Sequence, residues 1–207
     1  MKDSKLKLGA QNVHFMNSGA FTGEVSIEAL VECNVEYVLL GHSERRRIFS
    51  ESDESINAKM LKVLEHGLKP VLCIGESAKE RESGRMKDIN WHQLSQGLAG
   101  ISEKQLNDII IAYEPVWAIN NKYLNPDTEI RAATPEEALE SHKIVRTWFK
   151  EHYSENAASK IRIQYGGSMN KNNAEHLLAL EDIDGGLIGG ASLSKDAFLP
   201  ILEASLK

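Results

Sequence analysis

The stretch Ala112-Tyr113-Glu114-Pro115-Val116-Trp117 sets the architecture of this chain. The apolar run at 109–112 predicts a short buried strand that ends at Glu114. Pro115 lacks a backbone N–H and fixes its own φ, so the strand cannot continue and the chain turns into a loop. In α/β folds, the carboxyl ends of strands carry the chemistry. Glu114 is therefore a candidate acid or base; the alternative is a carboxylate that only caps the next turn.

The same pattern recurs along the chain and predicts a parallel sheet. Several continuous apolar runs close on glycine or a polar residue, as expected of strands buried on both faces. We expect strands at 37–40, 70–74, 109–112, 161–165 and 187–188.

Helical segments separate these strands. Residues 55–66 carry apolar side chains at helical spacing and stop at Gly67. Thr134 is expected to cap another helix, with Pro135 at its first position. This alternation predicts β/α units with right-handed crossovers. Since no linker or low-complexity segment interrupts it, we expect one domain over residues 1–207.

The composition excludes several classes of protein. The chain has 207 residues, 42% hydrophobic and 26% charged, with a net charge of −6. Its basic residues are interspersed with acids, which argues against a nucleic-acid partner. No apolar run reaches the roughly 18 residues of a membrane span, and no signal peptide is recognisable. We therefore expect no membrane partner and a cytoplasmic location.

Cys33 and Cys73 are expected to be buried thiols rather than a disulfide.

His42 follows the strand at 37–40 and precedes Ser43 and Glu44, which are expected to begin a helix. A helix N-terminus lowers the pKa of an imidazole and favours its neutral form, which can donate a hydrogen bond to a substrate oxygen. The alternative is a histidine that only packs at the strand end. The arginine run at 45–47 is expected to form a solvated or ion-paired helix face rather than a ligand site.

A second constellation follows the last two strands. Gly166-Gly167-Ser168 and Gly189-Gly190 allow close approach of backbone to a ligand, and their amides could cradle an oxyanion. In β/α barrels, phosphate is commonly bound by these two loops beside a short extra helix. Alone, such glycine pairs are more often plain turns.

Seven motifs, in order, resemble the triosephosphate isomerase family over nearly the whole chain. They are Gly9-Ala10-Gln11-Asn12, Gly19-Ala20-Phe21-Thr22-Gly23-Glu24, Leu40-Gly41-His42-Ser43-Glu44-Arg45-Arg46, Cys73-Ile74-Gly75-Glu76, Ala112 to Ile119, Tyr165-Gly166-Gly167-Ser168 and Leu187 to Leu193. The resemblance implies a TIM barrel that interconverts glyceraldehyde 3-phosphate and dihydroxyacetone phosphate as a homodimer. It implies no metal and no organic cofactor.

The resemblance also implies roles for the two candidate catalytic residues. Glu114 would shuttle a proton between two substrate carbons, and His42 would polarise the carbonyl and stabilise the enediolate. Ser43 and Glu44 would support His42, and Cys73 would only pack.

Further residues would bind the phosphate and the partner subunit. Ser168, Gly189 and Gly190 resemble the phosphate-binding residues. Thr22 resembles the residue that reaches into the active site of a neighbouring subunit.

The N-terminal part of the chain departs from the family pattern. The family's first strand, with Asn and Lys in a pattern like Asn-Trp-Lys-Met-Asn, has no counterpart here. We therefore expect the chain to start just before the family's third strand and to form an incomplete (β/α)8 barrel of about six units. Loss of the lysine charge would impair turnover, and the sheet would keep two open edges.

Residues 120–133 depart from the family's short glycine-rich lid, because this segment is longer and has no glycine. Two alternatives to an isomerase therefore stay open. One is a non-catalytic scaffold that uses this loop and the open edges for protein contacts. The other is a phosphate-binding barrel with different carbonyl chemistry.

Overall fold

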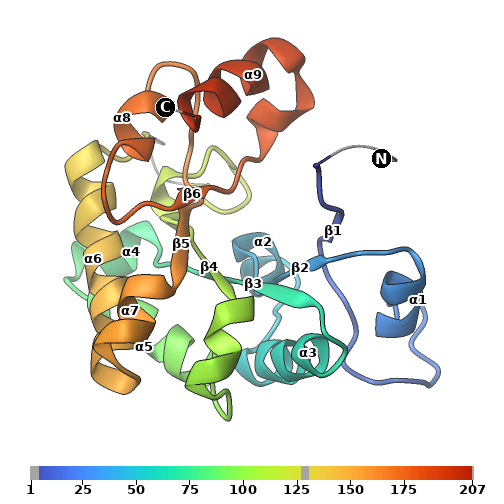
Figure 1. Ribbon diagram of the computed structural model, residues 1–207. Helices are drawn as coiled ribbons and strands as arrows, with labels where there is room; N and C mark the ends of the chain where they lie inside the picture. The colour runs from blue at the N-terminus through green and yellow to red at the C-terminus, as the bar shows by residue number, and fades with distance from the viewer. Residues whose placement is uncertain (1–4, 127–130, 207) are drawn as a thin grey trace.

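The computed structural model of the chain describes residues 5–126 and 131–206 (Figure 1). Six strands form one parallel sheet whose spatial order follows the chain, β1-β2-β3-β4-β5-β6. The strands are β1 (Gly9–Ala10), β2 (Tyr37–Leu40), β3 (Lys69–Ile74), β4 (Ile110–Tyr113), β5 (Arg162–Tyr165) and β6 (Gly185–Gly186). The expected incomplete TIM barrel of about six β/α units is confirmed.

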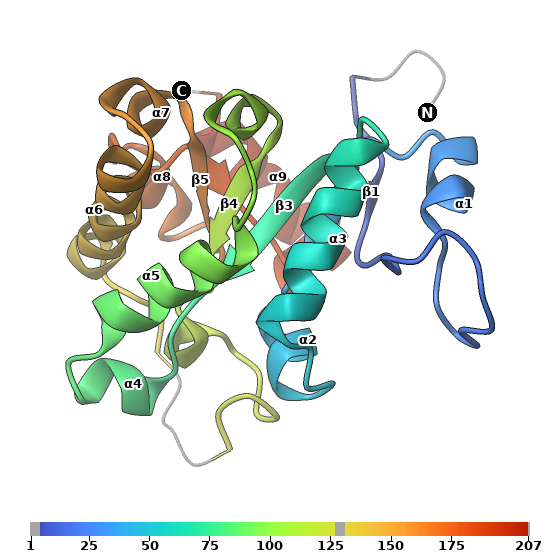
Figure 2. The same ribbon diagram turned by 90° about the horizontal axis from the view of Figure 1, so that it is seen from below.

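Helices connect the strands, and α9 follows the last of them. They are α1 (Ile27–Glu32), α2 (Ser43–Arg47), α3 (Asp53–Glu65), α4 (Ala78–Glu82), α5 (Met86–Gly97), α6 (Pro135–His152), α7 (Glu155–Lys160), α8 (Ala174–Leu178) and α9 (Lys195–Ala204), with short 3-10 turns η1 (Glu103–Asp108), η2 (Val116–Ala118) and η3 (Gly190–Leu193). Figure 2 shows α3, α5 and α6 along the same side of the sheet, and neighbours in this row pack together.

Local sequence signals explain where α3 and α6 begin. The Ser52 side chain caps α3 by accepting from the Ser55 N–H. Thr134 and Glu137 form a capping box at the start of α6, with Pro135 in its first turn. Both expected helices are confirmed, and α3 begins two residues earlier than its apolar spacing predicts.

The last strand lies earlier than expected. The ladder pairs Gln164 with Gly185 and Tyr165 with Gly186, and the Leu187 N–H then donates to the Tyr165 carbonyl at 2.9 Å. The apolar run at 187–188 therefore continues from the strand into the loop. The prediction of a strand at 187–188 was wrong because two glycines, which carry no hydropathy signal, make the ladder.

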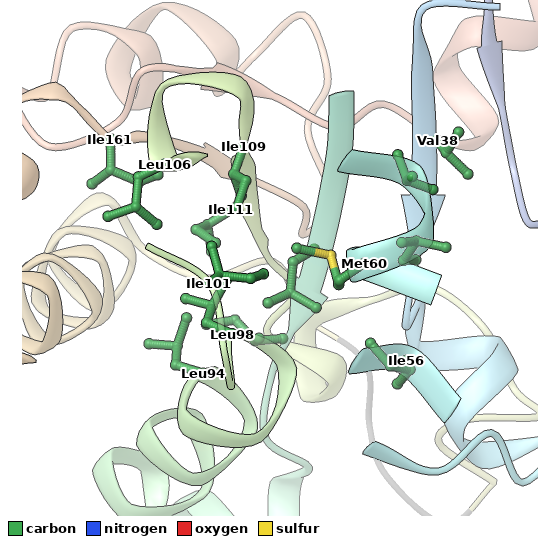
Figure 3. Close-up of a cluster of buried hydrophobic side chains, with 14 of the residues drawn as sticks. Val38, Ile56, Met60, Leu94, Leu98, Ile101, Leu106, Ile109, Ile111 and Ile161 are labelled. Atoms are coloured by element: carbon green, nitrogen blue, oxygen red, sulfur yellow. The ribbon is translucent and has the colours of Figure 1, made fainter. Parts of the chain in front are cut away.

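The main core lies between the sheet and its helices. It contains fully buried residues of β2, α3 and β4, such as Val38, Met60 and Ile111, and Figure 3 shows how these side chains converge. A smaller cluster on the opposite face of the sheet is built from Val71, Cys73, Ile110 and Ala112. Side chains on both faces of the central strands are thus buried, as the continuous apolar runs predicted.

Two sequence expectations concern cysteine and membrane spans. Cys73 is buried as expected, but Cys33 is exposed, because it lies at the C-cap of the short helix α1. The expectation of a buried Cys33 was therefore wrong. Within the described part of the chain, no helix is long and apolar enough to cross a membrane.

Candidate active site

His42 is positioned by the turn from β2 into α2. Gly41 has φ +70°, and a Cβ there would lie 3.2 Å from the Cys73 carbonyl oxygen, so the tight turn requires glycine. His42 is the N-cap of α2, and its Nδ1 accepts from the Glu44 N–H at 3.3 Å. This contact leaves Nε2 to carry the proton of the neutral imidazole.

Glu114 lies at the end of β4 with only 2% of its residue surface exposed. Its N–H donates to the Ile74 carbonyl at 2.7 Å, which carries the sheet pairing one residue past the strand. A Cβ at Gly75 would lie 1.7 Å from the Glu114 carbonyl oxygen, so only glycine permits this approach.

The Glu114 carboxylate contacts both residues at the start of α2. One oxygen accepts from the Ser43 N–H and the other from the Ser43 hydroxyl, each at 2.9 Å. His42 Nε2 lies 3.0 Å from Glu114 Oε1. The structure thus brings together the two candidate catalytic residues and Ser43 across 71 residues of sequence.

The contact with Glu114 controls the ionisation of His42. Burial disfavours a charged imidazole, but the hydrogen bond and charge of Glu114, with a contribution from Glu44, outweigh it and raise the pKa of His42. The expectation of a lowered His42 pKa was wrong for this arrangement. The sequence does not show that the Glu114 carboxylate contacts the ring nitrogen Nε2.

Cys73 lies behind the same carboxylate. Burial, together with the charge of Glu114, raises the pKa of the Cys73 thiol well above its ordinary value. The thiol therefore stays protonated near neutral pH and is a poor nucleophile.

A cavity of about 510 Å³ opens beside His42 and Glu114. Ser168, Gly189 and Gly190 line it from the last two strand-end loops. A Cβ at either of these two glycines would meet no atom within 4 Å, so their backbone borders open space. His42 and Glu114 therefore share one cavity with the predicted phosphate-binding residues Ser168, Gly189 and Gly190.

Ser168 is turned toward the start of the 120–133 loop. Its hydroxyl donates to the Ala118 carbonyl at 2.8 Å, and its own carbonyl accepts from Asn173 Nδ2 at 3.0 Å. The hydroxyl hydrogen is thus engaged, and the oxygen keeps only acceptor capacity toward the cavity.

The arginine run forms the expected ion-paired face of α2. The partners lie at the start of α3 and on α4: Arg45 pairs with Glu51 at 3.3 Å, Arg46 with Asp53 at 2.6 Å and Arg47 with Glu80 at 3.3 Å. Arg46 also donates to the Gly41 carbonyl at 2.8 Å, which fixes the turn that carries His42.

Glu76 is a buried residue at the site that sequence reasoning did not single out. Its carboxylate accepts from Trp117 Nε1 at 2.9 Å, from the Tyr113 hydroxyl at 3.0 Å and from Asn90 Nδ2 at 2.9 Å. Glu76 follows Gly75 at the end of β3, the same strand-end position that drew attention to Glu114. That position was the signal that could have found it.

The Trp117 ring also makes cation–π contacts with two arginines. The Arg81 guanidinium lies 4.7 Å and that of Arg131 4.9 Å from the Trp117 ring. Arg131 also pairs with Glu137 at 2.6 Å, and this contact lowers the pKa of Glu137 to about 2. The loop after Glu114 is therefore anchored at both of its ends.

Thr22 lies apart from this cavity. It is exposed, on the connection between β1 and α1, where the His14 N–H donates to the Val25 carbonyl at 2.9 Å.

Among the residues that the structure describes, no group of three His, Cys, Asp or Glu side chains could hold a metal ion.

Comparison with known proteins gives one consistent result. The family described as Triosephosphate isomerase matches residues 1–205. A protein of that name from Fusobacterium nucleatum is 48% identical over 204 residues, covering 99% of this chain and 78% of the relative. The proteins of that name from Alkaliphilus metalliredigens (46% over 200 residues, 97% of this chain and 77% of the relative) and Clostridium botulinum (45% over 203 residues, 98% and 79%) are also similar.

Proposed function

The chain belongs to the triosephosphate isomerase family, a family of enzymes, and from that premise we propose that it interconverts glyceraldehyde 3-phosphate and dihydroxyacetone phosphate through Glu114 and His42. The observation that carries this proposal is the 3.0 Å contact between His42 Nε2 and Glu114 Oε1 at the wall of a cavity that also holds Ser168, Gly189 and Gly190.

The proposed chemistry is a proton shuttle. Glu114 leaves Ser43, removes a proton from the substrate carbon beside the carbonyl and returns it to the neighbouring carbon, while the hydroxyl proton passes by way of His42 from one substrate oxygen to the other. The same movement frees His42 Nε2–H to donate to the substrate oxygen that becomes negative in the enediolate. Once the Glu114 carboxylate moves away, burial is the largest remaining influence on His42 and lowers its pKa, which suits a neutral hydrogen-bond donor.

The phosphate group would be bound by the last two strand-end loops. Backbone N–H groups at Gly189 and Gly190 border the open cavity and could cradle phosphate oxygens. Ser168 lies beside them as an acceptor of the Asn173 amide and a donor to Ala118, so it would have to turn to donate to the phosphate.

We further propose that turnover by these residues is impaired. Among the described residues that line the cavity, two are carboxylates, Glu44 and Glu114, and none is lysine or arginine. A dianionic substrate would therefore meet negative charge without a cation to offset it. This arrangement favours weak binding and a poorly stabilised enediolate.

A second candidate is a non-catalytic scaffold that uses the 120–133 loop and the sheet edges for protein contacts. The observation that favours it is the exposure of Tyr123, at 87% one of the most exposed large apolar side chains. The intact His42–Glu114 contact favours the isomerase instead.

The homodimer implied by the family is also part of the proposal. Large apolar side chains are exposed on the connection between β1 and α1, which carries Thr22; they are Met16, Phe21 and Val25. Phe49, just after α2, is exposed as well. Such side chains suit a contact with a second copy. Size-exclusion chromatography with light scattering tests this, and a monomer at all concentrations would contradict it.

Turnover of glyceraldehyde 3-phosphate by the purified chain tests the isomerase proposal. A Glu114→Gln variant is purified in parallel, because a trace of host enzyme could mimic weak activity. We expect measurable isomerisation that is at least about a hundredfold lower in Glu114→Gln, as for loss of a general base. Equal rates in both preparations would contradict the proposal.

A further inference from the structure

Asn121 joins the 120–133 loop to the catalytic cluster. Its Nδ2 donates to Glu44 Oε1 at 2.8 Å across 77 residues of sequence. Asn121, Glu44 and His42 line the same cavity. The contact thus lies at the site itself and comes from the segment that departs most from the family pattern.

The orientation of the Asn121 amide is fixed by the loop. Its Oδ1 accepts from the Tyr123 N–H at 2.9 Å, so the donor end must face the Glu44 carboxylate. The Asn121 carbonyl accepts from the N–H groups of Leu124 and Asn125 at 3.1 and 3.0 Å.

A buried side chain secures this turn from below. Asn125 is only 5% exposed, and its Nδ2 donates to the carbonyls of Val116 at 2.7 Å and Ile119 at 3.1 Å. The turn is therefore tied to the segment directly after Glu114, and Asn121 is presented to Glu44 in one orientation.

Glu44 depends on this contact for its place. Its Oε1 is bonded to Asn121, and its Oε2 lies 3.9 Å from His42 Nδ1. The Glu44 side chain is 46% exposed, so without an anchor it would gain rotamer freedom in solvent. The charged groups that face His42 are Glu114 at Nε2 and Glu44 at Nδ1.

We propose that Asn121 is a positioning residue that holds the Glu44 carboxylate beside His42 Nδ1. Asn121 acts through Glu44 and does not touch the reacting atoms. The role as part of an isomerase site rests on the proposed function, but the positioning itself does not. It can be measured on the resting protein, so its failure is distinguishable from a failure to turn over substrate.

The test is an NMR titration of the His42 imidazole in protein with isotope-labelled histidine. Because Glu44 contributes to the raised pKa of His42, Glu44→Gln is expected to lower that pKa by several tenths of a unit. Asn121→Ala is expected to lower it in the same direction, because the carboxylate moves into solvent. In a Glu44→Gln background, Asn121→Ala should have no further effect.

Two controls keep the result interpretable. Asn120→Ala removes a neighbouring amide that lines the same cavity and should leave the titration unchanged. Asn121→Gln keeps an amide donor and should recover part of the shift. An unchanged His42 pKa in Asn121→Ala or in Glu44→Gln, or an Asn121→Ala shift that persists in the Glu44→Gln background, would overturn the proposal.

Discussion

The Glu114 carboxylate is a buried acceptor held by the first residues of α2. Two donors come from Ser43, its N–H and its hydroxyl, and the third contact is His42 Nε2. A buried carboxylate is stable only when its oxygens are satisfied in this way. The same contacts hold the carboxylate against the start of α2, at the wall of the cavity.

Ser43→Ala removes one of these donors and leaves the other two. Hydrogen bonds to a charged buried group contribute about 1.5–3 kcal/mol, so we expect the free energy of unfolding in urea to fall by roughly 2 kcal/mol. Ser159→Ala, which removes an exposed hydroxyl, should change it by less than about 0.5 kcal/mol. Equal effects of the two substitutions would refute the described support of Glu114.

His142 makes the stability depend on pH. It is fully buried, and burial lowers its pKa to about 4, whereas the unfolded chain has a value near 6.5. The unfolded state therefore binds more protons between these values, and stability present above pH 6.5 is lost as the pH falls toward 4.

The pH effect can be isolated by substitution. Between pH 7 and pH 5, His142 should account for a loss of about 2 kcal/mol in the free energy of unfolding. His142→Gln should lose this part of the pH dependence, whereas His176→Gln, at an exposed position of α8, should keep it. The prediction fails if both variants follow the wild-type pH curve.

At the level of elements, the ends of β3 and β4 are coupled through Glu76. Its carboxylate binds Tyr113 from β4, Trp117 from η2 and Asn90 from α5. Glu76 is completely buried, so it ties the strand that ends in Glu114 to the neighbouring β/α unit.

Glu76→Gln keeps the shape of the side chain but removes its charge and one acceptor oxygen. Because one donor is then left without a partner, we expect the free energy of unfolding to fall by about 2–3 kcal/mol. Glu82→Gln, on the exposed side of α4, is the matched control. Chemical denaturation checks both variants, and a Glu76→Gln effect no larger than that of Glu82→Gln would contradict the described coupling.

For the whole molecule, the decisive feature is that six strands do not close the barrel. In the described part of the chain, β1 pairs only with β2 and β6 only with β5. A cavity of about 560 Å³, lined by Gly9, Tyr37, Gln164, Gly186 and others, lies on the inner face between these edges. Open edges of this kind favour pairing with further strands.

A separate polypeptide carrying the first two β/α units of a full-length family member should therefore bind. We expect it to raise the midpoint of thermal unfolding in a concentration-dependent way and to increase turnover. A control segment with proline in the middle of each strand cannot complete a ladder and should do neither. No shift with the intact segment would contradict this use of the free edges.

Much of this architecture could be predicted from the sequence because its signals are local. The apolar run 37–40 predicted β2, and the Thr134 cap predicted the start of α6, nearly to the residue. The order of the motifs predicted the barrel. Long-range contacts could not be predicted. No local pattern shows that Glu114 rests on His42 and Ser43, that Asn121 reaches Glu44, or that Gly185–Gly186 form a strand.

The role of Glu114 as the base can be tested by running the isomerisation in deuterium oxide and monitoring the triose phosphates by NMR. If Glu114 carries the proton between the two carbons, its acid exchanges with solvent, and deuterium enters the carbon-bound position of the product and the recovered substrate. We predict this incorporation with the purified chain and its loss in Glu114→Gln. Incorporation at equal rates in both proteins, or none with the unaltered chain, would contradict a catalytic Glu114.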